Sequence, residues 1–259
     1  AVFFFVIGCE LKHEFVLGTL SNPRIAAVPI GAALGGMVVA AGIFLAFNYG
    51  TQAQAAWGLP ISTDVAFALA VLAIAGKRLP IELRSFLLTL AVVNDLGAII
   101  VIAIFYGHGF YLGWFLITVA LLVIFGFLQS RKFTSLWIFL PLALTIWYAM
   151  LRSGIHATIA GVALGLLMRV RKTEGESISP CDKAEVKLRP FTAGFAVPVF
   201  AFLVAGVNVL GTSLEQALSD PLTIGVLCGL IIGQPVGVTA GAFIVSRFTK
   251  GTLNPALSW

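Results

Sequence analysis

The chain has 259 residues, of which 59% are hydrophobic and only 10% are charged, and its mean hydropathy is +1.04. A soluble domain carries about 25% charged residues, so this chain has too few polar side chains to cover a surface that faces water. The composition excludes an ordinary soluble protein and predicts that lipid surrounds most of the chain. The net charge of +5 comes from basic loops between apolar segments, and no nucleic-acid partner is expected.

Apolar runs separated by short polar connections predict an all-α membrane protein, a polytopic helical bundle. The chain starts at Ala1 inside an apolar run, with neither an initiator Met nor a basic leader, so we expect a fragment that lacks a preceding membrane helix. The runs 61–76 and 155–169 are shorter than the roughly 20 residues of a straight span and are predicted to be broken or tilted. The nine predicted segments are 1–11, 25–47, 61–76, 84–107, 112–128, 135–151, 155–169, 191–210 and 222–246.

The distribution of Lys and Arg supports this number of segments. Every basic residue except Arg152 falls in the first, third, fifth or seventh connection or in the C-terminal tail. Because positively charged loops stay in the cytoplasm, we predict a multi-pass protein of the bacterial inner membrane with Ala1 at the outer face and Trp259 in the cytoplasm. Residues 170–190 are predicted to form a cytoplasmic linker within a single membrane domain that spans residues 1–259.

The cysteines give no sign of a cofactor. Cys9, Cys181 and Cys228 are far apart in the sequence and lack the spacing of a metal site. We interpret them as small apolar residues and expect no structural disulfide, no cofactor and no resident metal ion.

Two of the 11 acidic residues lie deep in apolar sequence. Asp95 is near the middle of segment 84–107, where a carboxylate is tolerated mainly if it faces the bundle interior or an aqueous cavity. Asp64 follows Pro60, Ser62 and Thr63, which weaken a regular helix. We weigh two roles for Thr63 and Asp64: they satisfy the backbone of a broken helix, or they contact a cation directly.

A buried carboxyl can hold either a proton or a small hard cation, because desolvation disfavours the bare charge. Oxygen atoms of Asp, Thr and backbone carbonyls suit Na⁺ or Li⁺ in chemical type. Competition between H⁺ and Na⁺ for one site is the minimum mechanism of an antiporter. We therefore interpret Asp95, Asp64 and Thr63 as a cation- and proton-binding site.

Several motifs resemble those of the bacterial NhaA family of sodium/proton antiporters. The runs 63–69 and 94–100 resemble the family closely, and further matches are 7–14, 152–158, 198–202 and 232–237. Each run alone is weak, but together they are highly specific. The resemblance implies inverted repeats, two unwound helices that cross at mid-membrane, and exchange of Na⁺ or Li⁺ for H⁺ in pH and sodium homeostasis. It also implies that the full-length protein forms a homodimer, and that this fragment lacks the first and the last two membrane helices and does not transport alone.

The chain departs from well-studied family members at two positions. The resemblance implies an aspartate in those members at the position of Asn94 and a lysine at the position of Gln234. Losing both charges together preserves the charge balance, whereas leaving either alone would cost several kcal/mol. We therefore predict that Asn94 and Gln234 lie close together, and that a single titrating carboxylate makes the exchange electroneutral.

A polar cluster at the end of the first segment resembles part of the family's pH-responsive ion funnel. Its members are Glu10, Lys12, His13 and Glu14, with Glu185 from the later loop. An ordinary polar cluster that anchors a helix end explains these residues equally well. Val186 and Arg189 replace the histidines of that funnel, which puts pH sensing of the family type in doubt.

Other classes of function stay open at this point. Another sodium-coupled symporter or a cation channel also uses broken helices and buried aspartates. An intramembrane enzyme is disfavoured, because Asn94-Asp95 lacks the paired aspartates that aspartyl proteases or prenyl transferases need. A membrane scaffold without transport does not explain Asp95.

Overall fold

The computed structural model describes residues 1–62, 81–106, 109–133, 135–173, 176–204 and 219–249, and every regular element in these ranges is helical. Five of the described helices are long and apolar enough to cross a membrane, and two apolar helices are shorter. Each predicted segment coincides with a helix, except 61–76, most of which lies outside the described residues. The all-α membrane fold is confirmed. The helices group into two compact units, Ala1–Gly18 with Ile102–Val207 and Thr19–Val101 with Asn208–Trp259.

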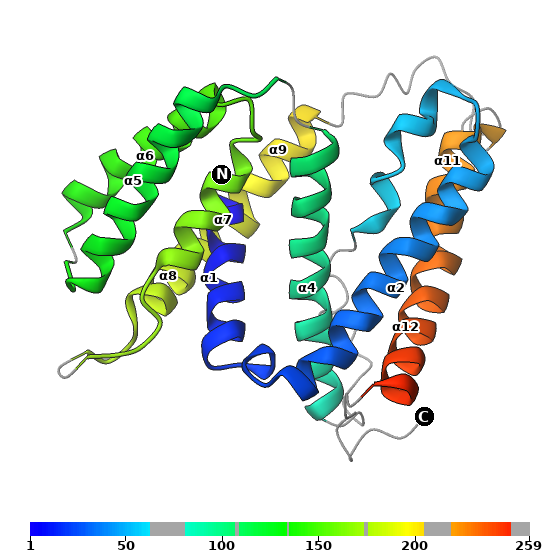
Figure 1. Ribbon diagram of the computed structural model, residues 1–259, viewed down its shortest axis with the longest axis horizontal. Helices are drawn as coiled ribbons and strands as arrows, with labels where there is room; N and C mark the ends of the chain where they lie inside the picture. Colours follow the sequence, from blue (N-terminus) through cyan, green and yellow to red (C-terminus); the bar gives the residue numbers. More distant parts are fainter. Residues whose placement is uncertain (63–80, 107–108, 134, 174–175, 205–218, 250–259) are drawn as a thin grey trace. The chain divides into compact units, whose positions relative to one another are not determined.

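In the first unit, α1 packs against α7 and α8, and α5 packs against α6 and α7 (Figure 1). Gly165 of α7 lies against Gly8 and Cys9 of α1 so closely that a Cβ at position 165 would come within 2.6 Å of the Cys9 nitrogen. The elements of this unit are α1 (Val2–Val16), α5 (Leu112–Ser130), α6 (Leu136–Arg152), α7 (Thr158–Leu167), α8 (Pro180–Phe191), the π-helical turn η4 (Thr192–Ala196) and α9 (Val197–Val204).

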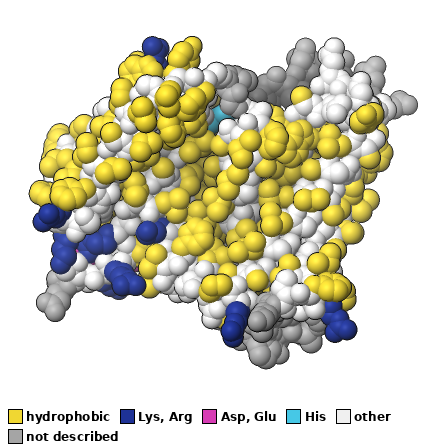
Figure 2. Space-filling view, in the orientation of Figure 1, with side chains coloured by type: hydrophobic (Ala, Val, Ile, Leu, Met, Phe, Trp, Pro, Cys, Tyr) yellow, Lys and Arg dark blue, Asp and Glu magenta, His cyan; other side chains and the backbone are white. Residues whose placement is uncertain are grey.

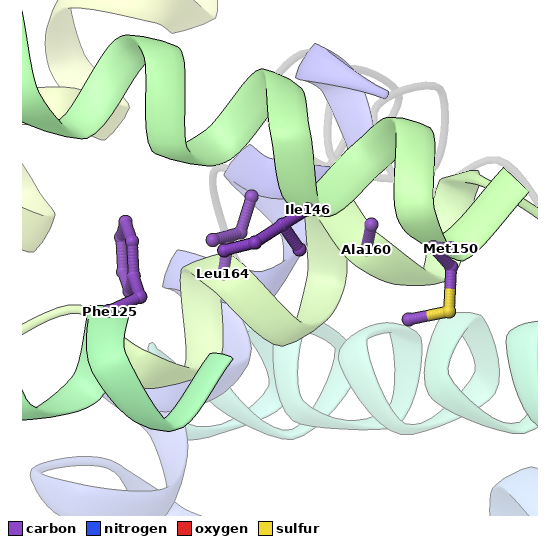
Figure 3. Close-up of a cluster of buried hydrophobic side chains, with 5 residues drawn as sticks. All are labelled: Phe125, Ile146, Met150, Ala160 and Leu164. Carbon is purple, nitrogen blue, oxygen red and sulfur yellow. The ribbon is translucent and has the colours of Figure 1, made fainter. Parts of the chain in front are cut away.

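The core of the first unit is an apolar cluster between α5, α6 and α7. Figure 3 shows its buried members, Phe125, Ile146, Met150, Ala160 and Leu164. Lipid tails are as apolar as these side chains, so the cluster stabilises the unit through van der Waals packing rather than by leaving water.

The outer surface of α5 and α6 is apolar. Figure 2 shows hydrophobic side chains over the visible face of these helices, and Trp137 is 91% exposed. Arg152, at the end of α6, lies over the ring of Trp114 near the start of α5, while Arg131 follows the other end of α5. The exposed apolar surface is the one that a bilayer covers, with basic side chains at its edges.

In the second unit, α2 and α12 lie side by side (Figure 1), and α2 also contacts α11 and η5. The elements of this unit are η1 (Thr19–Ser21), α2 (Pro23–Asn48), η2 (Gln52–Ala56), η3 (Leu59–Ile61), α4 (Ile81–Phe105) up to Val101, α11 (Pro221–Cys228), the π-helical turn η5 (Gly229–Gly233) and α12 (Gln234–Phe248).

Three helices begin with a polar N-cap followed by proline, a combination that satisfies a free backbone N–H and sets φ for the first turn. The side chains of Asn22, Ser179 and Asp220 accept hydrogen bonds of 3.1, 3.1 and 3.2 Å from backbone nitrogens one or two residues inside the helix. The second of these caps starts α8 at Pro180, so helix occupies the last part of the range 170–190 that the sequence predicted to be a linker.

A break divides the helix that ends the described chain. The π-helical turn η5 separates α11 from α12, and Pro235 is the second residue after it. Proline has no N–H to donate to the preceding turn, so the regular ladder is interrupted there. The sequence predicted broken or tilted helices at 61–76 and 155–169 and none in the segment 222–246, so this irregular turn, which Gln234 follows, was not predicted.

Candidate functional site

Asp95 lies near the middle of α4 and its side chain is partly buried, while the neighbouring Asn94 is only 3% exposed. The turn of α4 that follows Asp95 packs on α2: a Cβ at Gly97 would come 2.6 Å from the Met37 Sδ atom. Ala98 belongs to the buried cluster that contains Met37, Ala41 and Ile61. The central turn of α4 is thus fixed against α2 and η3.

Thr63 and Asp64 lie outside the described residues, so their predicted roles stay predictions. The structure does describe the residues immediately before them. Pro60 and Ile61 form the buried end of the short helix η3, and Ser62 is extended.

Gln234 is buried, and its side chain reaches the end of η3. The Nε2 atom donates hydrogen bonds of 3.0 Å to the carbonyl oxygens of both Pro60 and Ile61. We call this arrangement the Gln234 anchor. Its Oε1 atom lies against Gly36 of α2, where a Cβ would come within 2.6 Å. The amide therefore joins α12 to both η3 and α2.

The predicted contact between Asn94 and Gln234 remains a prediction. The Gln234 anchor restricts which atoms of Gln234 could form it. A side-chain amide has two hydrogens to donate, and Gln234 gives them to Pro60 and Ile61. In an amide–amide hydrogen bond, Gln234 would therefore act as the acceptor through Oε1.

A cavity of about 960 Å³ lies beside this region of the second unit. Met37 and Ala41 of α2, Ile61 of η3 and Val101 of α4 line part of it, and Thr51, Gln52 and Gln54 add polar groups. Val101 lies less than two turns along α4 from Asp95. The cavity thus borders the same packed residues that hold the central part of α4.

The polar residues predicted as a funnel are partly brought together in the first unit. Arg189 of α8 donates from Nη2 to Glu10 of α1 and, at 2.7 Å, to Glu185 of α8. We call these three residues the α1–α8 junction. Lys12, His13 and Glu14 lie on the same end of α1 and are partly buried.

From the sequence, Arg189 was noted only as a departure from the family pattern. Its contacts with both Glu10 and Glu185 were not predicted. The spacing of Glu185 and Arg189, four residues apart, is a signal for an ion pair on one helix face. The contact between Arg189 and Glu10 spans 179 residues of sequence, and no local pattern could indicate it.

Cys9 and Cys181 were interpreted as small apolar residues, and the fold buries them in one cluster with Val170. The Cys181 thiol donates a 3.5 Å hydrogen bond to the Cys9 carbonyl oxygen. All three cysteines are free thiols. The pair fixes the start of α8 against α1, close to the α1–α8 junction.

A family model described as Na+/H+ antiporter 1 matches residues 1–259. The chain belongs to the Na+/H+ antiporter 1 family. The resemblance stated from the motifs is thereby confirmed, and the intramembrane-enzyme alternative is removed, since this is a family of antiporters.

Three relatives show how far the likeness extends. The Na(+)/H(+) antiporter NhaA 1/4 of Streptomyces coelicolor is 46% identical over 271 residues, which cover 100% of this chain and 66% of the relative. The NhaA of Frankia casuarinae is 47% identical and that of Mycolicibacterium smegmatis 48% identical; each match covers 100% of this chain and 60% of the relative. The chain therefore spans about three fifths to two thirds of the length of these curated relatives.

Proposed function

We propose that the intact protein exchanges Na⁺ or Li⁺ for H⁺ across the bacterial inner membrane, with Asp95 as the carboxylate that holds either ion. The observation that carries the proposal is the position of Asp95: a partly buried acid in the middle of a 25-residue apolar helix. The match of the whole chain to an antiporter family supports it.

The proposed chemistry is competition at one carboxylate. A protonated Asp95 is neutral and a sodium-loaded Asp95 is compensated, whereas the bare carboxylate is costly at membrane depth. If the site changes sides only when it is occupied, each sodium ion that moves one way requires a proton to move the other. Thr63, Asp64 and backbone carbonyls are proposed to supply further oxygen ligands.

We further propose that this exchange is electroneutral. Asn94 is 3% exposed and Gln234 is 6% exposed, and both are uncharged. With Asn94 neutral, Asp95 titrates without a second acid beside it in the sequence, and one proton replaces one sodium ion. The cytoplasmic position of the C-terminal end and a homodimeric full-length protein are parts of the same proposal.

A vesicle assay tests the exchange. The intact protein is reconstituted into liposomes, and sodium-induced proton movement is followed with an internal pH dye, with and without Asp95→Asn. We expect the substitution to abolish the signal. The matched control is Asp220→Asn, since Asp220 is an exposed N-cap and asparagine caps helices equally well. Exchange that survives Asp95→Asn would refute the assignment, and sodium uptake that requires an organic solute would indicate a symporter.

A further inference from the structure

We propose that Gln234 is a positioning residue for the cation site: its amide holds the end of η3, and through η3 it holds the turn of α4 that follows Asp95. This inference rests on the exchange proposed above. It gives Gln234 a role in placing backbone, which differs from the charge balance that the sequence suggested.

The first step is the contact itself. Gln234 is 6% exposed and donates 3.0 Å hydrogen bonds to two consecutive carbonyl oxygens, those of Pro60 and Ile61. Ser62, the next residue, has φ −103° and ψ 138° and is extended, so the helix does not continue directly past these carbonyls. A helix end buried in a membrane protein needs such donors. The anchor supplies them from another helix.

The second step leads from η3 to α4. Ile61 is 1% exposed and packs with Met37, Ala41 and Ala98. Ala98 follows Asp95 by three residues, a spacing that puts the two on neighbouring positions of the same helix face. A shift of the Ile61 backbone therefore disturbs the packing of the turn that follows Asp95.

The third step is the packing of the Gln234 amide against α2. A Cβ at Gly36 would come 2.6 Å from the Oε1 atom of Gln234 and 2.9 Å from the Cγ2 atom of Val238. We therefore expect an alanine there to push the amide away from its carbonyl partners and to shift the Val238 side chain. Two substitutions on different helices can thus break the same anchor. Gly42, on the same helix α2, has nothing within 4 Å of the position that a Cβ would take and offers a matched control.

The experiment measures sodium-driven exchange by the intact protein in vesicles at one fixed alkaline pH, as the apparent KM for Na⁺ and the maximal rate per folded protein. Gln234→Met keeps the length of the side chain and removes both donors. We expect about a tenfold rise in KM with the maximal rate within about twofold of wild type, and a similar rise for Gly36→Ala. The double variant should resemble either single variant, because both remove one contact. Gly42→Ala should leave KM unchanged.

A conservative rescue separates donation from packing. Gln234→His retains one uncharged N–H donor at the alkaline pH of the assay, and we expect its KM to rise less than that of Gln234→Met. The inference is overturned if KM is unchanged in both Gln234→Met and Gly36→Ala, or if Gln234→His shifts KM as much as Gln234→Met. Should Gln234→Met fail to reach the membrane, Gly36→Ala against Gly42→Ala decides. A wild-type protein without sodium-dependent proton movement would instead reject the exchange itself.

Discussion

Gly35 of α2 and Gly237 of α12 pack backbone against backbone, so that a Cβ added to either would overlap the carbonyl oxygen of the other. One turn away, a Cβ at Gly241 would likewise overlap the carbonyl oxygen of Gly31, whereas a Cβ at Gly31 would overlap the Val245 side chain. Between membrane helices, small residues permit this close approach and the van der Waals contact that it brings. The packing fixes α12, which carries Gln234, on the helix that carries Gly36.

This packing predicts a stability effect for Gly35→Ala. The added methyl group has no free space, and overpacking costs about 1–3 kcal/mol, so we expect the melting temperature in detergent to fall by about 2–10 °C. Gly42→Ala is the control. Nothing lies within 4 Å of the position that a Cβ at residue 42 would take, and alanine has a higher helix propensity than glycine. The melting temperature of Gly42→Ala should therefore stay the same or rise. Equal melting temperatures for the two variants would contradict the close approach.

The buried pair of thiols predicts a labelling pattern. Cys9 and Cys181 are each 0% exposed, whereas Cys228 is partly exposed. We expect a small maleimide to label Cys228 in the folded protein and all three cysteines after denaturation in detergent, because a reagent must reach the sulfur atom. Mass spectrometry of peptides reads the result, and Cys228→Ala should remove the label from the folded protein. Rapid labelling of Cys181 in the folded state would show that α8 does not pack on α1 as described.

The α1–α8 junction predicts a new pH dependence for Arg189→His. Replacing Arg189 by histidine puts a titratable partner beside Glu10 and Glu185, the two carboxylates that Arg189 binds. A histidine between two carboxylates has a raised pKa, and its contribution is complete below about pH 6.5 and lost as the pH rises through the raised value. Since Arg189 is 57% exposed, we expect a loss of about 1 kcal/mol or less.

Thermal unfolding between pH 5 and pH 9 checks this effect. The melting temperature of Arg189→His, relative to wild type at the same pH, should fall as the pH rises. Arg189→Lys is the control, since lysine keeps its charge across this range. A difference that does not change with pH would show that the junction contributes nothing through charge.

The loop that precedes α8 has an acid-sensitive ion pair. Arg169 binds both carboxylate oxygens of Glu176, and these bonds, with one from the Thr173 nitrogen, lower the pKa of Glu176 to about 2. Because the pKa is lowered on folding, the stabilisation is present above the ordinary pKa of 4.5 and is lost as the pH falls towards 2. Hydrogen exchange at the Thr173 amide, referenced to an unstructured peptide, should show protection that fades over this range.

Glu176→Gln is the matching variant for that loop. It removes the charge, so protection of the Thr173 amide should be lower than in wild type above about pH 4.5, should approach the wild-type value as the pH falls towards 2, and should no longer change between pH 2 and 5. A pH dependence that persists in this variant would assign the acid sensitivity to another group.

If the exchange is electroneutral, its rate should not depend on the membrane potential. One proton for one sodium ion moves no net charge, so the rate of exchange in vesicles should not change when a potassium gradient with valinomycin sets a membrane potential. The double variant Asn94→Asp with Gln234→Lys restores the charged pair of the well-studied members, and we expect it to become voltage-sensitive. A voltage-driven current from the wild-type protein, reversing at a ratio of two protons per sodium ion, would contradict the proposal.

The membrane class, the helices and the family could be predicted from the sequence because their signals are local. Apolar runs and basic connections report the surrounding solvent, and the described helices fall where the runs predicted. One helix was not predicted: α8 starts at Pro180 because Ser179 caps it, within the range 170–190 that was expected to be a linker because of its polar composition.

Other relationships depended on tertiary structure. The sequence by itself determined that the chain belongs in a membrane, that Asp95 lies within an apolar segment, and that positions 94 and 234 hold uncharged amides. Only the fold decided that Gln234 binds the Pro60 and Ile61 carbonyls, that Arg189 joins Glu10 to Glu185, and that Cys9 meets Cys181. The physical reason is range: burial and helix formation follow from neighbouring residues, whereas these contacts join residues more than 170 positions apart, as the pairs 234 with 60, 189 with 10 and 181 with 9 show. Which side chain completes a hydrogen bond at such a distance is set by how the helices pack.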